Sequence, residues 1–362
     1  ALTDVNVDPK DPVFRQIYDL QDRQHSDSLL LWLAHENPTY RYSAAMAFAS
    51  VKDSAAVEKL AELLQDPVDE VRAAAAYAIG QAGIAAGEDF LIAAFDQTDT
   101  VGLYRKSNRA ILEAVGKCGT MKTLRAMSTV STYLPSDTLL LEGQTRGIYR
   151  FALRKITAPE GTARMMELAA DPAYPESVRL VAANYLSRAE NITIDSVASL
   201  PLIAATASEL NPDIRMALVA ALGKAKNRAA LEALLSMLSR EQDYRVKCNI
   251  LRAFANYEYG AVQAAALAAL KDPNPHVAFR AAQYFFENGI AQDAPFYWRT
   301  ARDTLHWNAQ LQLYAAAHRY LPLAQSEIRN TLNWELRQRF TGGAGPYQKA
   351  AALRALAEFP WN

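Results

Sequence analysis

Three arginines with a helical spacing are the first group of residues that could recognise a ligand. Arg146, Arg150 and Arg154 follow one another at intervals of four residues. On a helix, residues three or four apart are neighbours, so this spacing places three guanidinium groups on one face. Such a face is repulsive unless a carboxylate, an anion or water relieves it. We therefore expect either pairing within the chain, with Asp137 and Glu142, or a site for an acidic peptide or an anion.

Basic and aromatic residues in the preceding segment extend this candidate binding surface. Tyr104, Arg105 and Arg109 lie close together in the sequence and add both kinds of side chain. Between them and the three arginines runs a segment rich in serine and threonine, residues 128–136. We expect all six residues to belong to one recognition site, at a place where the chain departs from its regular pattern.

The residues that usually carry catalysis or hold metals form no recognisable group. The five histidines include no HExxH motif, and Walker, GxGxxG and GxSxG motifs are absent from the sequence. One His-Glu pair, His35-Glu36, stands alone, and a single pair does not supply a metal site. Cys118 and Cys248 form no CxxC motif and are typical of small buried residues. We therefore expect a non-catalytic chain without a cofactor or a metal.

The composition favours a protein partner. The chain has 362 residues, of which 51% are hydrophobic, and a formal net charge of −1. A nearly neutral chain has no global attraction for nucleic acid or for an anionic membrane. No apolar run approaches the roughly 20 residues that span a bilayer. We expect a protein or peptide partner, an acidic one if the arginines bind it, and neither nucleic acid nor a membrane.

A recurrent helical unit must position these residues. Asp66-Pro67 is a helix-start signal with Asp66 as N-cap, and Gly83 stands where the helix would end. Between them apolar residues recur at the helical period from Val71 to Ala82. A shorter amphipathic segment follows, and then the same offsets return. Other units begin with the same helix-start signal, at Asn37-Pro38, Asn211-Pro212 and Asp272-Pro273. The positions equivalent to Arg72 are Arg41, Asn108, Arg146, Arg179, Arg215, Lys247 and Ala278.

These units predict an all-α solenoid. A helix pair of this size cannot bury its own apolar face, so neighbouring pairs must stack into a continuous core. Strand signals are nearly absent. We expect about ten helix pairs in a single solenoid over residues 11–362, after a tail of residues 1–10 and with an irregular repeat at 137–156. Because no polar capping unit closes the series, we expect more protein to follow.

The unit Asp66–Gly83 closely resembles a HEAT repeat of the bacterial type, and Asn211–Lys226 nearly so. The resemblance covers residues 11–359 at varying strength. It implies a right-handed α-α superhelix, the HEAT-repeat solenoid, that serves as a protein–protein interaction scaffold. It also implies that Asp66, Arg72, Arg179 and Arg215 bond between neighbouring repeats.

Three enzyme classes share this architecture. The di-iron deoxyhypusine hydroxylase carries several His-Glu pairs on repeated helices, whereas this chain has one. A HEAT-like DNA glycosylase needs a basic groove, which the balanced charge does not indicate. A bilin lyase needs a tetrapyrrole site, which no residue marks. The glycosylase, or another nucleic-acid-binding protein, and the bilin-lyase type stay as alternatives to the scaffold.

Several segments are similar to the N-terminal HEAT region of exported bacterial proteins that end in a cyclophilin-type peptidyl-prolyl isomerase. They are Ile17–Gln24, Leu29–Leu33, Asn37–Arg41, Ala44–Ser50 and Gly116–Gly119. The resemblance implies that the chain presents partners or substrates to an isomerase domain beyond Asn362. It also implies a location in the bacterial cell envelope, as a periplasmic or otherwise exported protein.

Overall fold

A computed structural model of the chain describes residues 4–99, 101–321 and 326–358. Within these ranges the chain forms 21 α-helices and no strand, which confirms the predicted all-α fold class. The helices divide into two compact units, Ala1–Ile192 and Thr193–Asn362. The single solenoid over residues 11–362 stays a prediction, and residues 359–362 of it lie outside the described ranges.

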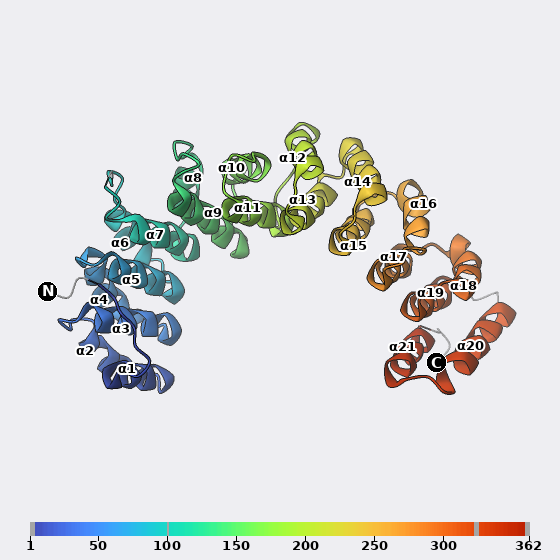
Figure 1. Ribbon diagram of the computed structural model, residues 1–362, viewed down its shortest axis with the longest axis horizontal. Coiled ribbons are helices and arrows are strands. Elements are labelled where there is room, and N and C mark those ends of the chain that lie inside the picture. Colours follow the sequence, from blue (N-terminus) through green and yellow to red (C-terminus); the bar gives the residue numbers. More distant parts are fainter. Residues whose placement is uncertain (1–3, 100, 322–325, 359–362) are drawn as a thin grey trace. The chain divides into compact units, whose positions relative to one another are not determined.

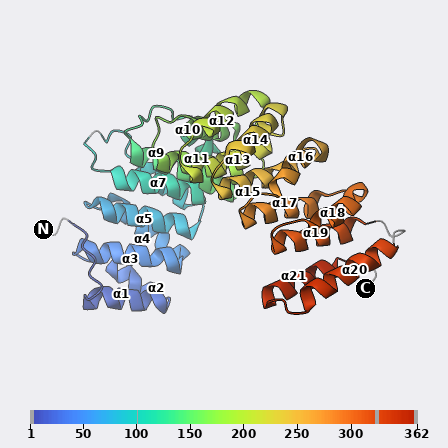
Figure 2. The same cartoon turned by 45° about the vertical axis from the view of Figure 1, so that its right-hand side comes forward.

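The first unit consists of two layers of helices that alternate along the chain (Figures 1 and 2). In one layer each helix packs against the next, and its members are α1 (Pro12–Asp22), α3 (Pro38–Val51), α5 (Asp69–Ala82), α7 (Arg105–Cys118), α9 (Thr138–Leu153) and α11 (Glu176–Arg188). The second layer packs on the first and consists of α2 (Ser26–Trp32), α4 (Val57–Glu62), α6 (Gly87–Ala94), α8 (Met121–Ser128) and α10 (Pro159–Ala170). This alternation is the predicted stack of helix pairs.

The second unit repeats this arrangement. One layer consists of α13 (Pro212–Ala225), α15 (Tyr244–Ala253), α17 (Pro275–Asn288), α19 (Trp307–Tyr320) and α21 (Pro346–Ala357). The other consists of α12 (Ser196–Ser208), α14 (Arg228–Arg240), α16 (Tyr259–Ala269), α18 (Ala294–Arg302) and α20 (Ser326–Thr341). Four short 3-10 helices complete the two units, at Ser54–Ala56, Leu63–Gln65, Phe254–Asn256 and Ala291–Asp293.

The predicted apolar stripe forms the core of each repeat. In α5 the side chains of Val71, Ala75, Ala78 and Ile79 are completely buried. Small alanines in the stripe let neighbouring helices approach closely, and bulkier residues fill the space between the layers. Gly83 ends α5 in the left-handed conformation, with φ of 70°, as the sequence predicts.

The predicted helix starts are confirmed at two sites and wrong at two. Asn37 and Asn211 cap α3 and α13, and each side chain accepts a hydrogen bond from the second following amide. Asp66 does not cap α5, which begins three residues later at Asp69. Similarly, α17 begins at Pro275 under an Asn274 cap, not at Asp272-Pro273. In both cases the acidic residue opens a tight turn before the helix instead.

Asp66 is used between repeats, as the HEAT resemblance implies. Its carboxylate accepts hydrogen bonds from Arg41 Nε at 2.7 Å and Nη2 at 3.0 Å, and from the Val68 amide at 2.9 Å. Arg72 donates to the backbone carbonyl of Leu103 in the next repeat. Arg215 binds Glu241 at 3.0 Å. These bonds join successive repeats across their loops.

The structure shifts the predicted register of the irregular repeat by one residue. In α9 the buried side chains include Gln144, Thr145, Ile148 and Phe151. Thr145 is fully buried and therefore takes the place of Arg72, whereas Arg146 is 38% exposed. The equivalence of Arg146 with Arg72 is wrong, because the irregular loop before α9 adds a residue to the spacing. The three arginines lie beside the buried row and face α7.

Candidate functional site

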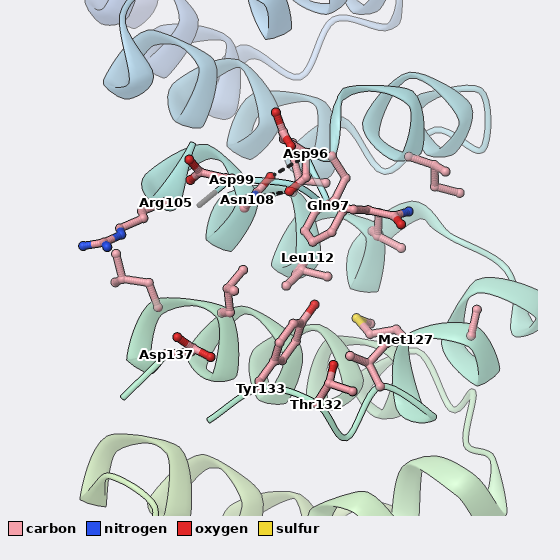
Figure 3. Close-up of a pocket in the computed structure, with 18 of the residues that line it drawn as sticks. Asp96, Gln97, Asp99, Arg105, Asn108, Leu112, Met127, Thr132, Tyr133 and Asp137 are labelled. Carbon is pink, nitrogen blue, oxygen red and sulfur yellow. Dashed lines mark hydrogen bonds between the residues drawn. The ribbon is translucent and has the colours of Figure 1, made fainter. Parts of the chain in front are cut away.

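An open pocket in the first unit lies beside the irregular repeat (Figure 3). Its volume is about 1000 Å³. It lies between the second-layer helices α6 and α8, with α7 as its floor and the loop segments 95–99 and 129–137 as its walls. These loops are longer than the tight turns elsewhere in the unit, so the two outer helices leave the space between them open.

The interior of the pocket is apolar. Ile111, which is buried, and Leu112 line it from α7, and Met127 lines it from α8. Figure 3 shows the Tyr133 ring beside Leu112 and Met127, below the one and to the left of the other. Burial raises the pKa of Tyr133, so its hydroxyl keeps its proton at neutral pH. The Tyr133 hydroxyl forms no hydrogen bond with another described residue and faces the open space.

Hydrogen bonds hold the two wall loops in place. The Asp96 amide donates to Asn108 Oδ1 at 3.0 Å, and Asn108 Nδ2 donates to the Asp96 carbonyl at 2.8 Å (Figure 3). Asp99 accepts bonds from the Leu103 and Tyr104 amides at 2.8 and 2.9 Å. In the other loop Asp137 accepts from the Leu134 amide at 2.8 Å. The rim is therefore polar, and hydrogen bonds tie its described residues together.

Of the six residues predicted to bind a ligand, only Arg105 lines the pocket. In Figure 3 its side chain points away from the apolar interior. Tyr104 precedes Arg105 in the sequence, but the guanidinium group of Arg72 lies over its ring, 4.2 Å from the ring centre. The Tyr104 ring therefore contributes to the contact between α5 and the start of α7. The pocket is lined mainly by apolar residues that the sequence analysis did not predict as a site.

The other four predicted residues lie at the contact between α7 and α9. Arg109 binds Glu142 at 2.9 Å. Arg150 binds Glu113 through two bonds of 3.0 and 2.8 Å, and Arg146 lies 3.9 Å from the same carboxylate. The arginine row thus pairs within the chain, but with Glu113 and not with the predicted Asp137 and Glu142, and Glu142 binds Arg109 instead. A ligand of these arginines stays a prediction.

Arg154 differs from the other arginines of the row because it has no carboxylate. Its Nη1 donates to the Gly116 and Gly119 carbonyls at 3.2 and 2.9 Å, at the C-terminal end of α7. Its side chain is exposed. Both carbonyls accept hydrogen bonds from the same nitrogen, Nη1. A guanidinium group has five N–H donors, so the donors on its other nitrogens stay available to solvent.

No metal centre is formed by the described part of the chain. It contains no group of three histidine, cysteine, aspartate or glutamate side chains that could hold a metal ion. The described helices also include none that is long and apolar enough to cross a membrane.

The comparisons with known proteins concern the repeat and the fold. A family model of HEAT repeats matches residues 26–107. A comparison with curated protein sequences finds no match. Kap95p, in a structure that describes how its binding changes the switch loops of RanGDP, aligns with a TM-score of 0.58 at 12% identity, over 96% of this chain and 52% of that chain.

Two further solved structures align with this chain. Importin beta aligns with a TM-score of 0.56 at 14% identity, over 99% of this chain and 51% of that one. Human deoxyhypusine hydroxylase in complex with glycerol aligns over 74% of this chain and 96% of that one at 18% identity, but its TM-score of 0.33 supports no argument.

The chain thus spans about half the length of the Kap95p and importin beta chains it resembles. At 12 and 14% identity the likeness concerns the fold alone. Taken with the repeat geometry, the comparisons establish that the chain carries HEAT repeats at residues 26–107 and has a helical-solenoid fold.

Proposed function

We propose that this chain is a non-catalytic protein-interaction scaffold that docks an extended segment of a partner protein in the pocket beside α7. The observation that carries the proposal is the pocket itself, with about 1000 Å³ of open space between two loops. An apolar interior with a polar rim is the usual anatomy of a binding site. Leu112, Met127 and Tyr133 would receive apolar side chains of the segment, and the rim would bind its backbone.

The size of the pocket supports a peptide as the occupant. Its volume is at the upper end of the range for small-molecule sites, which is about 300 to 1000 Å³. The loops that form it are the irregular part of an otherwise regular stack, and binding residues concentrate on such loops. Kap95p, a chain of similar fold, binds RanGDP, so a protein partner is known for this kind of helical solenoid.

The finer form of the proposal is that the chain is the HEAT module of a larger folding factor. It rests on the sequence resemblance to exported bacterial proteins with a cyclophilin-type isomerase. In that arrangement the scaffold would hold a substrate near the isomerase, in the cell envelope, and its own part would be non-catalytic. The glycosylase and bilin-lyase alternatives stay untested predictions.

A display experiment tests the docking pocket and does not require that the partner be known. Peptides of about 12 residues are selected from a random library on the full chain, and their affinities are measured for the wild type and for Tyr133→Asp. We expect Tyr133→Asp to weaken the selected peptides about tenfold or more, because a carboxylate cannot be buried against apolar side chains without cost. Tyr18→Asp, which alters an exposed tyrosine of α1, is the matched control.

Two results would contradict this proposal. One is a library that yields no peptide with measurable affinity. The other is a set of selected peptides that bind Tyr133→Asp as tightly as the wild type and the Tyr18→Asp control. Circular dichroism of each variant checks that its helices are retained.

A further inference from the structure

Three cations stand at the same place in three successive repeats of the first unit. Lys117, Arg154 and Arg188 each follow a buried core residue by six positions, and those core residues are Ile111, Ile148 and Ala182. The three helices that carry them, α7, α9 and α11, pack in sequence, α7 on α9 and α9 on α11. We call Lys117, Arg154 and Arg188 the basic ladder.

None of the three cations forms an ion pair within the described residues. The Lys117 ammonium lies over the Tyr77 ring, 4.3 Å from its centre. Arg154 binds the two carbonyls at the end of α7, and Arg188 Nη1 donates to the Tyr149 hydroxyl at 3.3 Å. Neutral partners hold the side chains in position while their charges stay uncompensated.

The carboxylates near the basic ladder are already engaged. Glu113 is taken by Arg150 at 2.8 Å, and Glu190 by Lys155 at 3.3 Å. The buried Glu88, which interacts with Arg154 at longer range, accepts hydrogen bonds from Thr120 and Thr123. The surface therefore has an excess of positive charge although the whole chain has a net charge of −1.

Two further cations lie near Lys117. Burial is the main cause that lowers the pKa of Lys117; Glu113 opposes it, and Arg150 and Lys52 lower the pKa by smaller amounts. Like charges held together without a counter-charge make a surface that gains energy when an anion binds. The attraction of α-helix C-termini for cations accounts for one charge at each helix end. That attraction does not explain why each nearby carboxylate is paired with another residue and leaves these cations without a counter-charge.

We propose that the basic ladder binds an extended acidic segment of a protein, with one carboxylate at every third residue. Packed helices are about 8–10 Å apart, so successive cations are separated by about that distance along the stack. In the polyproline II conformation an extended chain rises about 3.1 Å per residue with three residues per turn, so every third side chain lies on the same face, about 9 Å from the previous one. An acidic segment of this spacing places one carboxylate on each of Lys117, Arg154 and Arg188.

The basic ladder and the pocket are separate surfaces. Lys117, Arg154 and Arg188 do not line the pocket, and the acidic segment does not require that the pocket be occupied. The sequence analysis predicts an acidic partner for the row Arg146, Arg150 and Arg154. The basic ladder keeps an acidic partner but changes its contacts, because only Arg154 of that row belongs to the ladder. The other two members come from the helices on either side of α9.

The surroundings of the basic ladder favour a peptide over single-stranded nucleic acid. Proteins that bind single strands use aromatic rings on which bases stack. The face of the Tyr77 ring is covered by Lys117, and the Tyr149 hydroxyl is bound to Arg188. Three cations alone would give a phosphate backbone only weak binding that salt readily removes.

The test uses two synthetic fluorescein-labelled peptides of identical composition and the full chain. One has an aspartate at every third position over 12 residues, with serine and glycine between, and the other has its four aspartates in one block. Fluorescence anisotropy at low salt measures both affinities. We expect the spaced peptide to bind several-fold more tightly than the block peptide, because only the spaced peptide reaches all three cations at once.

Variants identify the residues responsible. We expect the triple variant Lys117→Gln, Arg154→Gln, Arg188→Gln to bind the spaced peptide about tenfold more weakly. The matched control is Arg23→Gln, Lys59→Gln, Arg125→Gln, which removes the same charge from exposed positions of the same unit. The control is expected to keep most of the affinity. Glu113→Gln removes the competing carboxylate and is expected to tighten binding.

Four outcomes would overturn the proposal. They are equal affinity of the two peptides, wild-type affinity in the triple variant, an equal loss in the control triple, and tighter binding of a single-stranded oligonucleotide of the same charge. If the triple variant does not fold, Arg188→Gln alone serves as the test. Arg188 is exposed, and among the described residues its side chain bonds only to a tyrosine hydroxyl, so the substitution should leave the helix ends intact.

Discussion

At the scale of single residues, glycines set how closely α7 and α9 approach. A Cβ atom on Gly147 would lie closer than 3.0 Å to the Leu112 carbonyl oxygen of α7, and one on Gly116 would meet the backbone of Gly147. Backbone atoms cannot move aside as a flexible side chain can. The two glycines therefore permit the helix contact that places Arg150 on Glu113 and Arg154 on the end of α7.

We expect Gly147→Ala to lower the free energy of unfolding by about 1–3 kcal/mol, the usual cost of overpacking. The midpoint of urea unfolding measures it. Gly260→Ala is the control, because nothing lies within 4 Å of a Cβ atom at that position in α16. It should stabilise the chain by up to about 1 kcal/mol through helix propensity. A Gly147→Ala variant as stable as the wild type would contradict the close contact.

His318 is a buried residue whose titration couples to folding. Burial lowers the pKa of His318 to about 4, and its Nδ1 lies 3.0 Å from the Ala355 carbonyl oxygen. The unfolded chain has the ordinary histidine pKa near 6.5. Between these values the unfolded state binds the proton and the folded state does not, so lowering the pH favours unfolding.

We expect the contribution of His318 to stability to be complete above about pH 6.5 and to be lost progressively as the pH falls towards about 4. The slope is at most about 1.4 kcal/mol per pH unit. Urea unfolding at several pH values measures it. His318→Gln should flatten this part of the profile, while His276→Gln, at an exposed histidine, should leave it unchanged. Parallel profiles for wild type and His318→Gln would show that the folded protein does not exclude this proton.

At the scale of the helical element, ion pairs join one repeat to the next through the loop before its first helix at three boundaries of the described chain, at Asp66, Glu241 and Asp272. Asp66 is the best example, since its carboxylate is 4% exposed and serves both Arg41 and the Val68 amide. A buried carboxylate that loses its partner is costly, whereas an exposed ion pair contributes little. The loop before α5 therefore depends on Asp66 more than the helix does.

We expect Asp66→Asn to lower the free energy of unfolding by about 3 kcal/mol, because it leaves Arg41 without its counter-charge at the repeat boundary. The thermal unfolding midpoint is the measurement. Asp19→Asn alters an ion pair with Arg23 in which both side chains are more than half exposed, and it should cost less than about 0.5 kcal/mol. Similar midpoints for the two variants would contradict a structural role for Asp66.

At the scale of the whole molecule, the chain consists of two units, each with its own stacked core. In repeat proteins each repeat contacts its neighbours, so a local change is felt mainly close to the site. The pocket and the basic ladder both belong to the first unit. The two proposed binding surfaces therefore lie on the same stacked core.

We expect a destabilising change in the first unit to leave the second unit protected. In hydrogen exchange measured by mass spectrometry, Gly147→Ala should raise exchange in peptides from α7 and α9 and leave α15 to α19 unchanged. The reciprocal variant is a core substitution in α17, Phe285→Ala, which should raise exchange in the second unit only. Equal acceleration in both units would mean that they unfold as one.

Much of the fold could be predicted from the sequence because the signals are local. The spacing of Val71, Ala75, Ala78 and Ile79 is a property of one helix, and it predicts both the helix and its buried face. Helix starts were harder to predict. An Asp-Pro pair can cap a helix or open a turn before it, and the distant partner Arg41 decides the outcome at Asp66.

Little of the candidate site could be predicted in the same way. The Arg146 row drew attention because its spacing is visible within one helix, yet the carboxylate that pairs with Arg150 lies 37 residues earlier in α7. Lys117 and Arg188 gave no local signal. Their common spacing of six positions after a buried core residue becomes visible only when the helices are aligned by which residues are buried.

The sequence alone determined that this protein is a stack of helix pairs, because periodic apolar residues and cap residues act over one or two turns. The tertiary structure decided which charges are paired, which cations stay without a carboxylate, and where two irregular loops leave a pocket open. These features depend on side chains from repeats more than 30 residues apart, and on backbone contacts such as that of Gly147 with α7. Their physical basis is packing across repeats, which no local pattern in the chain specifies.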